Sequence, residues 1–357
     1  MRIKSNRSGR CVGTGFIALD VIRSAVSDNT TLERRHAGGS CGNVLADLAF
    51  LGMHASAVGR IGNDVAGGEL LADLRRCGVD VTLLAVEEGR RTPVVIQETI
   101  VDARGGRRHR FSRACPVCGA AMAGYRPVLD SGIQDIATAL PEHEVFFFDR
   151  VAPGTLTLAR RSRELGALVV FEPSGVKDEA LFVECLNVSH VFKYSHERLS
   201  GLEALVRRAR PPLEIQTLGA DGLRFRLRGT GGRPDWVSLE ALPAPSVRDA
   251  AGSGDWCTAG LVLRMAQQGL TSLQRFKQDL VVAALQFGQA LAALNCSYDG
   301  ARGLMYAVTR GRALDAAERL IQKKRPRLPP IADANTSGIR NDRACTVCTS
   351  DLLQYHA

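Results

Sequence analysis

The sequence predicts an α/β fold in which helices flank a mostly parallel central sheet. Short apolar runs lie at residues 145–149, 167–171, 188–192 and 213–218. Their length and composition are typical of strands that are buried on both faces. Stretches with helical spacing separate these runs, and the alternation favours βαβ units. Two strand-like segments earlier in the chain add a small β lid to the prediction.

The first apolar stretch, residues 11–22, predicts a strand that leads into a loop. It contains two glycines and Asp20, so it does not resemble the apolar core of a signal peptide. No apolar run approaches the roughly 20 residues that a membrane helix needs. We therefore expect a cytoplasmic protein with no membrane partner.

The predicted lid is a hairpin. Residues 92–99 resemble an exposed strand, and residues 107–111 return as a second strand after a turn at Gly105 and Gly106. Five arginines and one histidine lie within residues 104–113. One or two of these arginines could bind a phosphorylated substrate, because Arg binds phosphate in a fork. The alternative is a solvated hairpin whose charges have no ligand.

The second half of the chain supplies the remaining predicted elements. Helical spacing predicts a helix over residues 155–165, between the first two buried runs, and two late helices over residues 253–268 and 280–294. Residues 331–357 are polar and loop-like, and we expect them to form a tail outside the main core.

These elements give one main domain over residues 11–330. Its lid comprises about residues 91–114 plus part of residues 20–37, and the tail follows over residues 331–357.

Composition narrows the class of partner. The chain has 357 residues, of which 45% are hydrophobic, and a formal net charge of +9. A basic balance favours anionic partners such as a nucleotide or a sugar phosphate. Aromatic residues make up only 5% of the chain, which argues against the stacking surfaces that bind single-stranded nucleic acid.

A glycine-rich motif near the end of the main domain carries the strongest chemical signal. Residues 249–260 read DAAGSGDWCTAG. Gly252, Ser253 and Gly254 form a turn that opens a predicted helix, where several backbone N–H groups lack partners and can bind an anion. Asp255 follows directly and could take a proton from an attacking hydroxyl. The alternative is an ordinary helix start, and the motif is not a Walker A loop because no Lys-Ser/Thr pair follows.

Two signatures in this chain resemble those of the ribokinase-like (PfkB) carbohydrate kinases. Residues 249–255, DAAGSGD, look like the family's D-T-x-G-A-G-D. Residues 36–68 are similar to the second signature, a Gly-Gly pair followed by Asn, an Ala/Leu-rich helix and V-G-x-x-G-x-D-x-x-G. The signatures occur in the expected order, and the resemblance covers about residues 11–325.

The resemblance implies a fold and a set of binding residues. A ribokinase-like fold holds the sugar between the central sheet and the lid. The positions that match substrate contacts are Asp20, Gly38, Gly39 and Asn43. An ordinary turn carboxylate and a helix N-cap are the alternative roles for Asp20 and Asn43.

The resemblance also implies a nucleotide site and a catalytic turn. Residues 213–222, LEIQTLGADG, are similar to the family's T-x-G-x-x-G. The matching nucleotide-binding positions are Thr217, Gly219 and Gly222. In the catalytic turn Gly252, Ser253 and Gly254 would surround the moving phosphoryl group, with Asp255 as the base.

Metal ions are expected with the nucleotide. Mg²⁺ accompanies ATP because it neutralises phosphate charge, and relatives often bind a monovalent cation near the position of Asp249. The family's N-x-x-E segment departs here, since Ser195 replaces Asn, Glu197 is one position early and Arg198 falls where Glu is expected. Glu197 is therefore the candidate for ordering the Mg²⁺ shell.

Two C-x₂-C pairs are foreign to the general family. Cys115 and Cys118 form one pair, and Cys345 and Cys348 form the other. Four thiolates suit one tetrahedral Zn²⁺, which would staple the tail to the base of the lid. Unrelated reduced thiols or redox-active dithiols are the alternatives.

Taken together, these features predict an ATP-dependent kinase that phosphorylates a hydroxyl group of a sugar or sugar-like metabolite. A nucleoside kinase of the same fold is the nearest alternative. A catalytically weak, kinase-derived metabolite-binding regulator is another, favoured by the altered N-x-x-E segment. The resemblance also suggests a homodimer formed through the lids.

Overall fold

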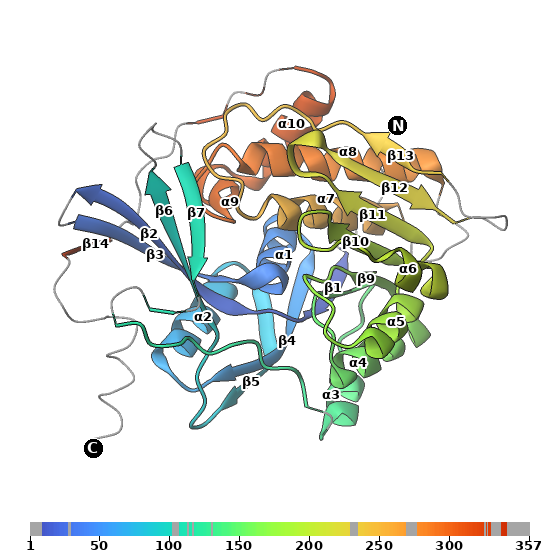
Figure 1. Ribbon diagram of the computed structural model, residues 1–357, viewed down its shortest axis with the longest axis horizontal. Coiled ribbons are helices and arrows are strands. Elements are labelled where there is room, and N and C mark those ends of the chain that lie inside the picture. Colours follow the sequence, from blue (N-terminus) through green and yellow to red (C-terminus); the bar gives the residue numbers. More distant parts are fainter. Residues whose placement is uncertain are drawn as a thin grey trace.

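A computed structural model shows a large sheet covered by helices, with a smaller sheet projecting from one side (Figure 1). The structure describes residues 9–27, 30–101, 107–112, 114–115, 118–129, 131–228, 235–268, 277–324, 326, 328–329 and 337–340.

The large sheet has nine strands. In spatial order they are β13 (Val237–Leu239), β12 (Leu223–Leu227), β11 (Leu213–Thr217), β10 (Val191–Ser195), β9 (Leu168–Phe171), β8 (Val145–Phe148), β1 (Arg10–Thr14), β4 (His54–Gly62) and β5 (Val79–Glu87). Pairing is parallel from β5 through β11, and only β12 and β13 add antiparallel pairs. This confirms the predicted mostly parallel sheet. The runs at residues 145–149, 167–171 and 213–218 contain β8, β9 and β11, whereas the run at 188–192 overlaps only the first two residues of β10, because Val188 ends a helix.

Each face of the large sheet has its own hydrophobic core. Successive side chains of a strand point to opposite faces, and β8 shows the division: Val145 and Phe147 join one core, whereas Phe146 and Phe148 join the other. The uninterrupted apolar character of VFFF therefore follows from burial on both faces.

Helices cover the two faces as separate groups (Figure 1). The helices that contribute to the first core are α1 (Gly39–Phe50), α2 (Val65–Arg76), α7 (Ser253–Gln267), α8 (Gln278–Asn295), α9 (Gly303–Ala307) and α10 (Arg310–Ile321). Those that contribute to the second are α3 (Ile133–Ala139), α4 (Pro153–Glu164), α5 (Glu179–Val188) and α6 (Glu203–Ala209). Within the described residues, no helix combines the length and the apolar character that crossing a membrane requires.

The smaller sheet is the lid. Its five strands, in spatial order, are β14 (Ser337–Arg340), β3 (Thr30–Gly38), β2 (Ala18–Ser27), β6 (Val94–Val101) and β7 (Arg107–Ser112). The hairpin predicted over residues 92–111 is present as β6 and β7, which pair antiparallel. The hairpin of β2 and β3 supplies two further strands of the lid, and β3 runs directly into α1.

The tail contributes one strand to the lid. β14, from the segment predicted as a loop-like tail, pairs antiparallel with the start of β3, where Arg340 lies opposite Thr30. It therefore extends the lid sheet at the edge opposite β7. Cys345 and Cys348 lie outside the described residues.

Candidate active site

The turn before α7 has the shape that its glycines allow. Gly252 caps the helix with a φ of 72°, and a Cβ placed there would lie 2.2 Å from the Ala301 carbonyl oxygen. Both facts require glycine at this position. Trp256 N donates to the Gly252 carbonyl at 2.9 Å, so α7 begins within the motif and its first amide groups face the turn.

Asp249 stabilises this turn through hydrogen bonds. Its carboxylate is 2% exposed. One oxygen accepts from Ala251 N at 2.8 Å, and the other accepts from Gly300 N at 2.7 Å and from Gln97 Nε2 at 3.2 Å. Gln97 belongs to lid strand β6, so Asp249 connects the turn to a neighbouring loop and to the lid. These contacts fit a turn-shaping role.

Asp255 and Asn43 meet although 212 positions separate them in the sequence. Asn43 Nδ2, in α1, donates to Asp255 Oδ2 at 2.9 Å. The pKa of Asp255 is raised to about 7, because burial and the Glu172 charge raise it by more than Asn43, Lys193 and Arg198 lower it. The structure thus brings the two sequence signatures to one point, at the N-terminus of α7.

The oxygen of the Asn43 amide has no partner among the residues that the structure describes. Asn43 is 5% exposed, and its Oδ1 accepts no hydrogen bond from any described residue. A buried acceptor left unsatisfied costs about 1–3 kcal/mol. A ligand hydroxyl that donates to Oδ1 would remove that cost. Because Nδ2 of the same amide bonds to Asp255, that hydroxyl would also lie near Asp255.

Asp20 occupies the root of the lid beside Gly38 and Gly39. The Gly39 N–H bonds to the Asp20 carboxylate, and a Cβ on Gly38 would lie 2.0 Å from Asp20 Oδ2. Gly39 itself has a φ of 72° and no room for a Cβ beside the Phe16 carbonyl. Burial raises the pKa of Asp20 to about 7, although Arg302 and the Gly39 N–H act in the opposite direction.

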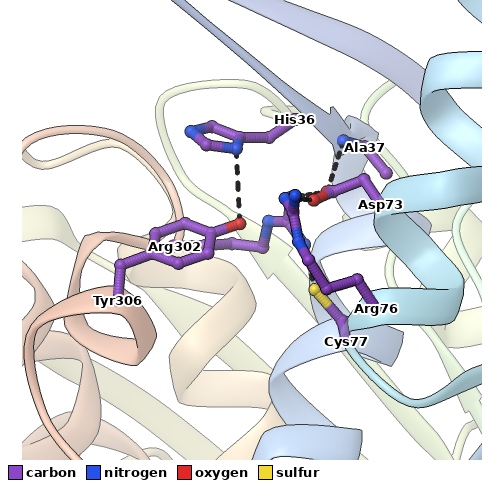
Figure 2. A network of polar contacts seen from close by, with 7 residues as sticks. All are labelled: His36, Ala37, Asp73, Arg76, Cys77, Arg302 and Tyr306. Atoms are coloured by element: carbon purple, nitrogen blue, oxygen red, sulfur yellow. Dashed lines mark hydrogen bonds and ion pairs between the residues drawn. The ribbon is translucent and has the colours of Figure 1, made fainter. Parts of the chain in front are cut away.

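A buried arginine that sequence reasoning missed, Arg302, lowers the pKa of Asp20 through its charge and belongs to the network of polar contacts in Figure 2. Arg302, in the loop between α8 and α9, is 3% exposed, and its Nη2 lies 2.5 Å from Asp73 Oδ2 on α2. The same Asp73 oxygen accepts from Ala37 N, in β3, at 2.8 Å. Arg302 Nη1 also donates to Cys77 Sγ at 3.4 Å.

An aromatic pair completes this network. The rings of His36, in β3, and Tyr306, in α9, stack with centroids 4.9 Å apart, and Tyr306 Oη lies 3.4 Å from His36 Nδ1 (Figure 2). The Arg302 guanidinium carbon lies 5.7 Å from the Tyr306 ring centroid. Lid strand β3 is therefore joined to the body of the molecule by the hydrogen bond from Ala37 N to Asp73 and by a ring stack.

The predicted nucleotide residues form the turn between β11 and β12. Leu218 N donates to the Gly222 carbonyl at 2.8 Å, and His196 N donates to the Thr217 carbonyl at 3.0 Å. Gly219 and Gly222 both have positive φ, 62° and 95°. Glu197 is exposed, and its Oε1 lies 3.5 Å from the position of a Gly219 Cβ. Glu197 is thus placed beside this turn, where a single carboxylate together with ATP phosphates fits the usual ligand set of Mg²⁺.

The predicted zinc ligands are only partly described. Cys115 is buried and Cys118 is exposed, while Cys345 and Cys348 lie outside the described residues. Among the residues that the structure covers, no three His, Cys, Asp or Glu side chains come close enough to hold a metal ion.

Known proteins are similar to this chain in sequence and in fold. The model of the pfkB family carbohydrate kinases matches residues 15–108. A fructokinase from Salmonella typhimurium is 25% identical over 273 residues, covering 69% of this chain and 82% of the relative. The structure of a fructokinase with bound ATP from Xylella fastidiosa has a TM-score of 0.65 at 21% identity, covering 89% of this chain and 99% of that one.

A nucleoside kinase shows a comparable likeness. The structure of the enzyme from Burkholderia thailandensis in complex with inosine has a TM-score of 0.61 at 19% identity, covering 88% of this chain and 99% of that one. These similarities confirm the fold and the resemblance predicted from the sequence.

Proposed function

Because the chain is a ribokinase-like carbohydrate kinase of the PfkB family, a phosphotransferase with an alcohol group as acceptor, we propose that Asp255 is its catalytic base. The reaction is transfer of the γ-phosphoryl group of ATP to a hydroxyl of a sugar or sugar-like metabolite. One observation carries the proposal: the 2.9 Å hydrogen bond from Asn43 to Asp255 joins both signatures at the start of α7.

The acceptor hydroxyl is activated between α1 and α7. Asp20, Gly38, Gly39 and Asn43 bind the acceptor, and Asn43 Oδ1 accepts a hydrogen bond from one of its hydroxyl groups. Asp255 removes the proton of the attacking hydroxyl; a base works best when its pKa lies near the working pH, and the pKa of Asp255 is raised to about 7.

The phosphoryl group passes over the turn formed by Gly252, Ser253 and Gly254. Its developing charge is stabilised by amide groups at the start of α7, which need no rearrangement during the reaction. Thr217, Gly219 and Gly222 bind the nucleotide. Bound Mg²⁺ neutralises phosphate charge, with Glu197 ordering its shell, and a monovalent cation binds near Asp249.

A substrate panel tests the reaction class. Purified protein with Mg-ATP is assayed for ADP formation against sugars, sugar phosphates and nucleosides, in buffers with K⁺, Na⁺ or neither. Sugar-dependent turnover is expected. Turnover confined to nucleosides would favour the nucleoside kinase alternative, to which the inosine-bound relative lends weight. Metabolite binding without ADP formation would favour the regulator alternative.

Asp255→Asn tests the base. Turnover should fall by about 10²–10⁴-fold, the usual contribution of a general base, while thermal-shift affinities for ATP and acceptor stay close to those of the wild type. Asp315→Asn is the matched control, because the Asp315 side chain is 70% exposed on α10. An Asp255→Asn enzyme with wild-type turnover would exclude the assignment.

We also propose a shared zinc site for Cys115, Cys118, Cys345 and Cys348. Four thiolates in two C-x₂-C pairs suit one tetrahedral Zn²⁺, and each pair follows a strand of the lid, β7 or β14. Metal analysis of the purified protein tests the site, and zinc retained after Cys345 and Cys348 are both changed to Ser would reject it.

Light scattering of the same samples tests the proposed lid-to-lid homodimer, and cell fractionation tests the cytoplasmic location.

A further inference from the structure

A lysine is completely buried beneath the catalytic turn. Lys193 lies within β10, and its side chain is 1% exposed. Its Nζ forms an ion pair with Glu172 Oε1, at the end of β9, and donates to the Gly254 carbonyl at 3.2 Å. Neither Lys193 nor Glu172 belongs to a binding or catalytic position predicted from the sequence.

Thr258 closes this cluster from the helix side. Its hydroxyl lies 2.5 Å from Glu172 Oε2 and 3.1 Å from the Gly254 carbonyl oxygen. Because these three side chains come from β10, from α7 and from the residue that follows β9, the start of α7 is fixed against the central sheet through side-chain contacts.

The Gly254 carbonyl connects this cluster to the chemistry. The peptide unit that carries it also carries the Asp255 N–H, one of the first amide groups of α7 and so without an intrahelical acceptor. A cation bound to the carbonyl polarises the peptide and strengthens its N–H as a donor, because linked hydrogen bonds reinforce one another. Lys193 therefore acts on the anion-binding turn without touching the phosphoryl group.

Stability alone does not account for such a pair. Removing two charges from water costs more than their attraction often returns, so an apolar pair of similar volume is commonly as stable. The placement of Lys193 and Glu172 directly under Gly254 gives the pair a role that an apolar pair could not fill.

We propose that Lys193 is a positioning residue for phosphoryl transfer, and that with Glu172 and Thr258 it orients and polarises the turn formed by Gly252, Ser253 and Gly254. This inference rests on the proposed kinase function. It assigns the turn a charged support that lies outside both signatures.

The same two charges act on Asp255 with opposite signs. Glu172 raises the pKa of Asp255 and Lys193 lowers it. The charged and titratable groups that surround Asp255 and Lys193 are Glu172 after β9, Lys193 from β10, Arg198 from the following loop, Cys41 and Asp47 from α1, and Cys257 from α7. Exchanging only Glu172 or only Lys193 should therefore move the acid limb of activity in opposite directions.

Three variants test the role of Lys193. In Lys193→Met, kcat should fall about 10–100-fold, which is somewhat less than the fall caused by removing a direct donor. KM for ATP should change less than threefold, and the acid limb of kcat should move to higher pH. In Glu172→Gln the limb should move to lower pH. Lys193→Arg should recover part of kcat, because it retains the charge. Shifts in the same direction, or a Lys193→Met enzyme with kcat within twofold of the wild type, would overturn the inference.

Folding and function are separated by two further measurements. The double variant Glu172→Gln/Lys193→Met leaves no unpaired charge, so a folded double variant with low kcat still supports the inference. Thermal unfolding with Mg-ADP, acceptor and aluminium fluoride, which takes the place of the transferred phosphoryl group, tests anion binding by the turn. Aluminium fluoride should stabilise wild type and Asp315→Asn more than Lys193→Met. If the wild type turns over none of the substrates, the proposed function fails, whereas equal stabilisation of wild type and Lys193→Met overturns the role of Lys193 alone.

Discussion

Two buried ion pairs support the two ends of the candidate site, and they differ in what they connect. Lys193 and Glu172 lie beneath the proposed phosphoryl end, where they connect the central sheet to α7. Arg302 and Asp73 lie beneath the proposed acceptor end, where Asp73 also accepts from the Ala37 amide of the lid.

The difference separates an ion pair whose described contacts lie outside the lid from an ion pair whose contacts include the lid. All partners of the Lys193 cluster belong to the central sheet and its packed helix. The Arg302 network, by contrast, includes His36 and Ala37 of lid strand β3 (Figure 2). Changes beneath the turn should therefore act mainly on kcat, and changes beneath the lid root should act mainly on KM for the acceptor.

Arg302→Met should have the largest effect on stability. It leaves the Asp73 carboxylate buried without its main counter-charge, and breaking a buried pair typically costs about 3–5 kcal/mol. Urea unfolding measures this loss, and steady-state kinetics should show a raised acceptor KM. Arg319→Met is the control, because the Arg319 side chain is 52% exposed on α10. Equal stability of the two variants would remove Arg302 from the comparison.

Two alanine variants test the phosphoryl end. Gly252→Ala places a Cβ 2.2 Å from the Ala301 oxygen at a φ of 72°, so the turn must deform and kcat should fall about 10²–10³-fold, as when an anion-stabilising donor is lost. Gly254→Ala meets only ordinary contacts, at 3.9 Å from Glu172 Oε1 and 4.0 Å from Lys193 Nζ. Circular dichroism of both variants should be unchanged, and a Gly252→Ala enzyme as active as Gly254→Ala would contradict the steric argument.

Asp20→Asn tests the acceptor end. Hydrogen bonds to a charged group contribute about 1.5–3 kcal/mol, so kcat/KM for the acceptor should fall about tenfold to a hundredfold while KM for ATP stays constant. The carboxylates of Asp20 and Asp255 both have a pKa raised to about 7, and both must be ionised. Below pH 7 the wild-type kcat/KM for the acceptor should therefore fall as two carboxylates take up protons. In Asp20→Asn it should fall less steeply, as only Asp255 takes up a proton. Identical pH profiles would show that Asp20 does not titrate in the reaction.

The sequence was sufficient for the features that depend on local pattern. Four apolar runs predicted buried strands, and two signatures predicted that Asn43 and Asp255 belong to one site. The lid hairpin over residues 92–111 was also identified, because its turn and its strands are adjacent in the chain. The β2–β3 half of the lid was only partly anticipated, since its strands form a sheet through pairing with β6 and β14.

The charged supports of the site depend on distant pairing. Arg302 and Asp73 are 229 positions apart, and no spacing rule connects an arginine in a loop with an aspartate on an earlier helix. Lys193 did leave a signal, a single charge next to the apolar run at residues 188–192, but it was interpreted only as the start of the altered N-x-x-E segment. Its partner, Glu172, comes close to Lys193 because β9 and β10 pair side by side in the sheet.

Changes in His36 should have the smallest effect at neutral pH. Its stacked pair with Tyr306 contributes about 0.5–1.5 kcal/mol, so His36→Ala should lose that stability at pH 8 and His36→Phe, which keeps a ring, should lose less. The pKa of His36 is lowered to about 3, because burial and the charges of Arg302, Arg34 and Arg76 lower it by more than Asp73 raises it.

Acidification gives the His36 variants a clearer signature. The unfolded state takes up a proton near pH 6.5 and the folded state does not until about pH 3, so wild-type stability falls as the pH drops between those values. Both variants lack this group and should lose less stability over that range, as urea unfolding at pH 8 and pH 5 would measure. A wild-type loss no greater than that of His36→Phe would show that His36 is not held neutral at the lid root, and the acceptor end would then be more open to solvent than its contacts indicate.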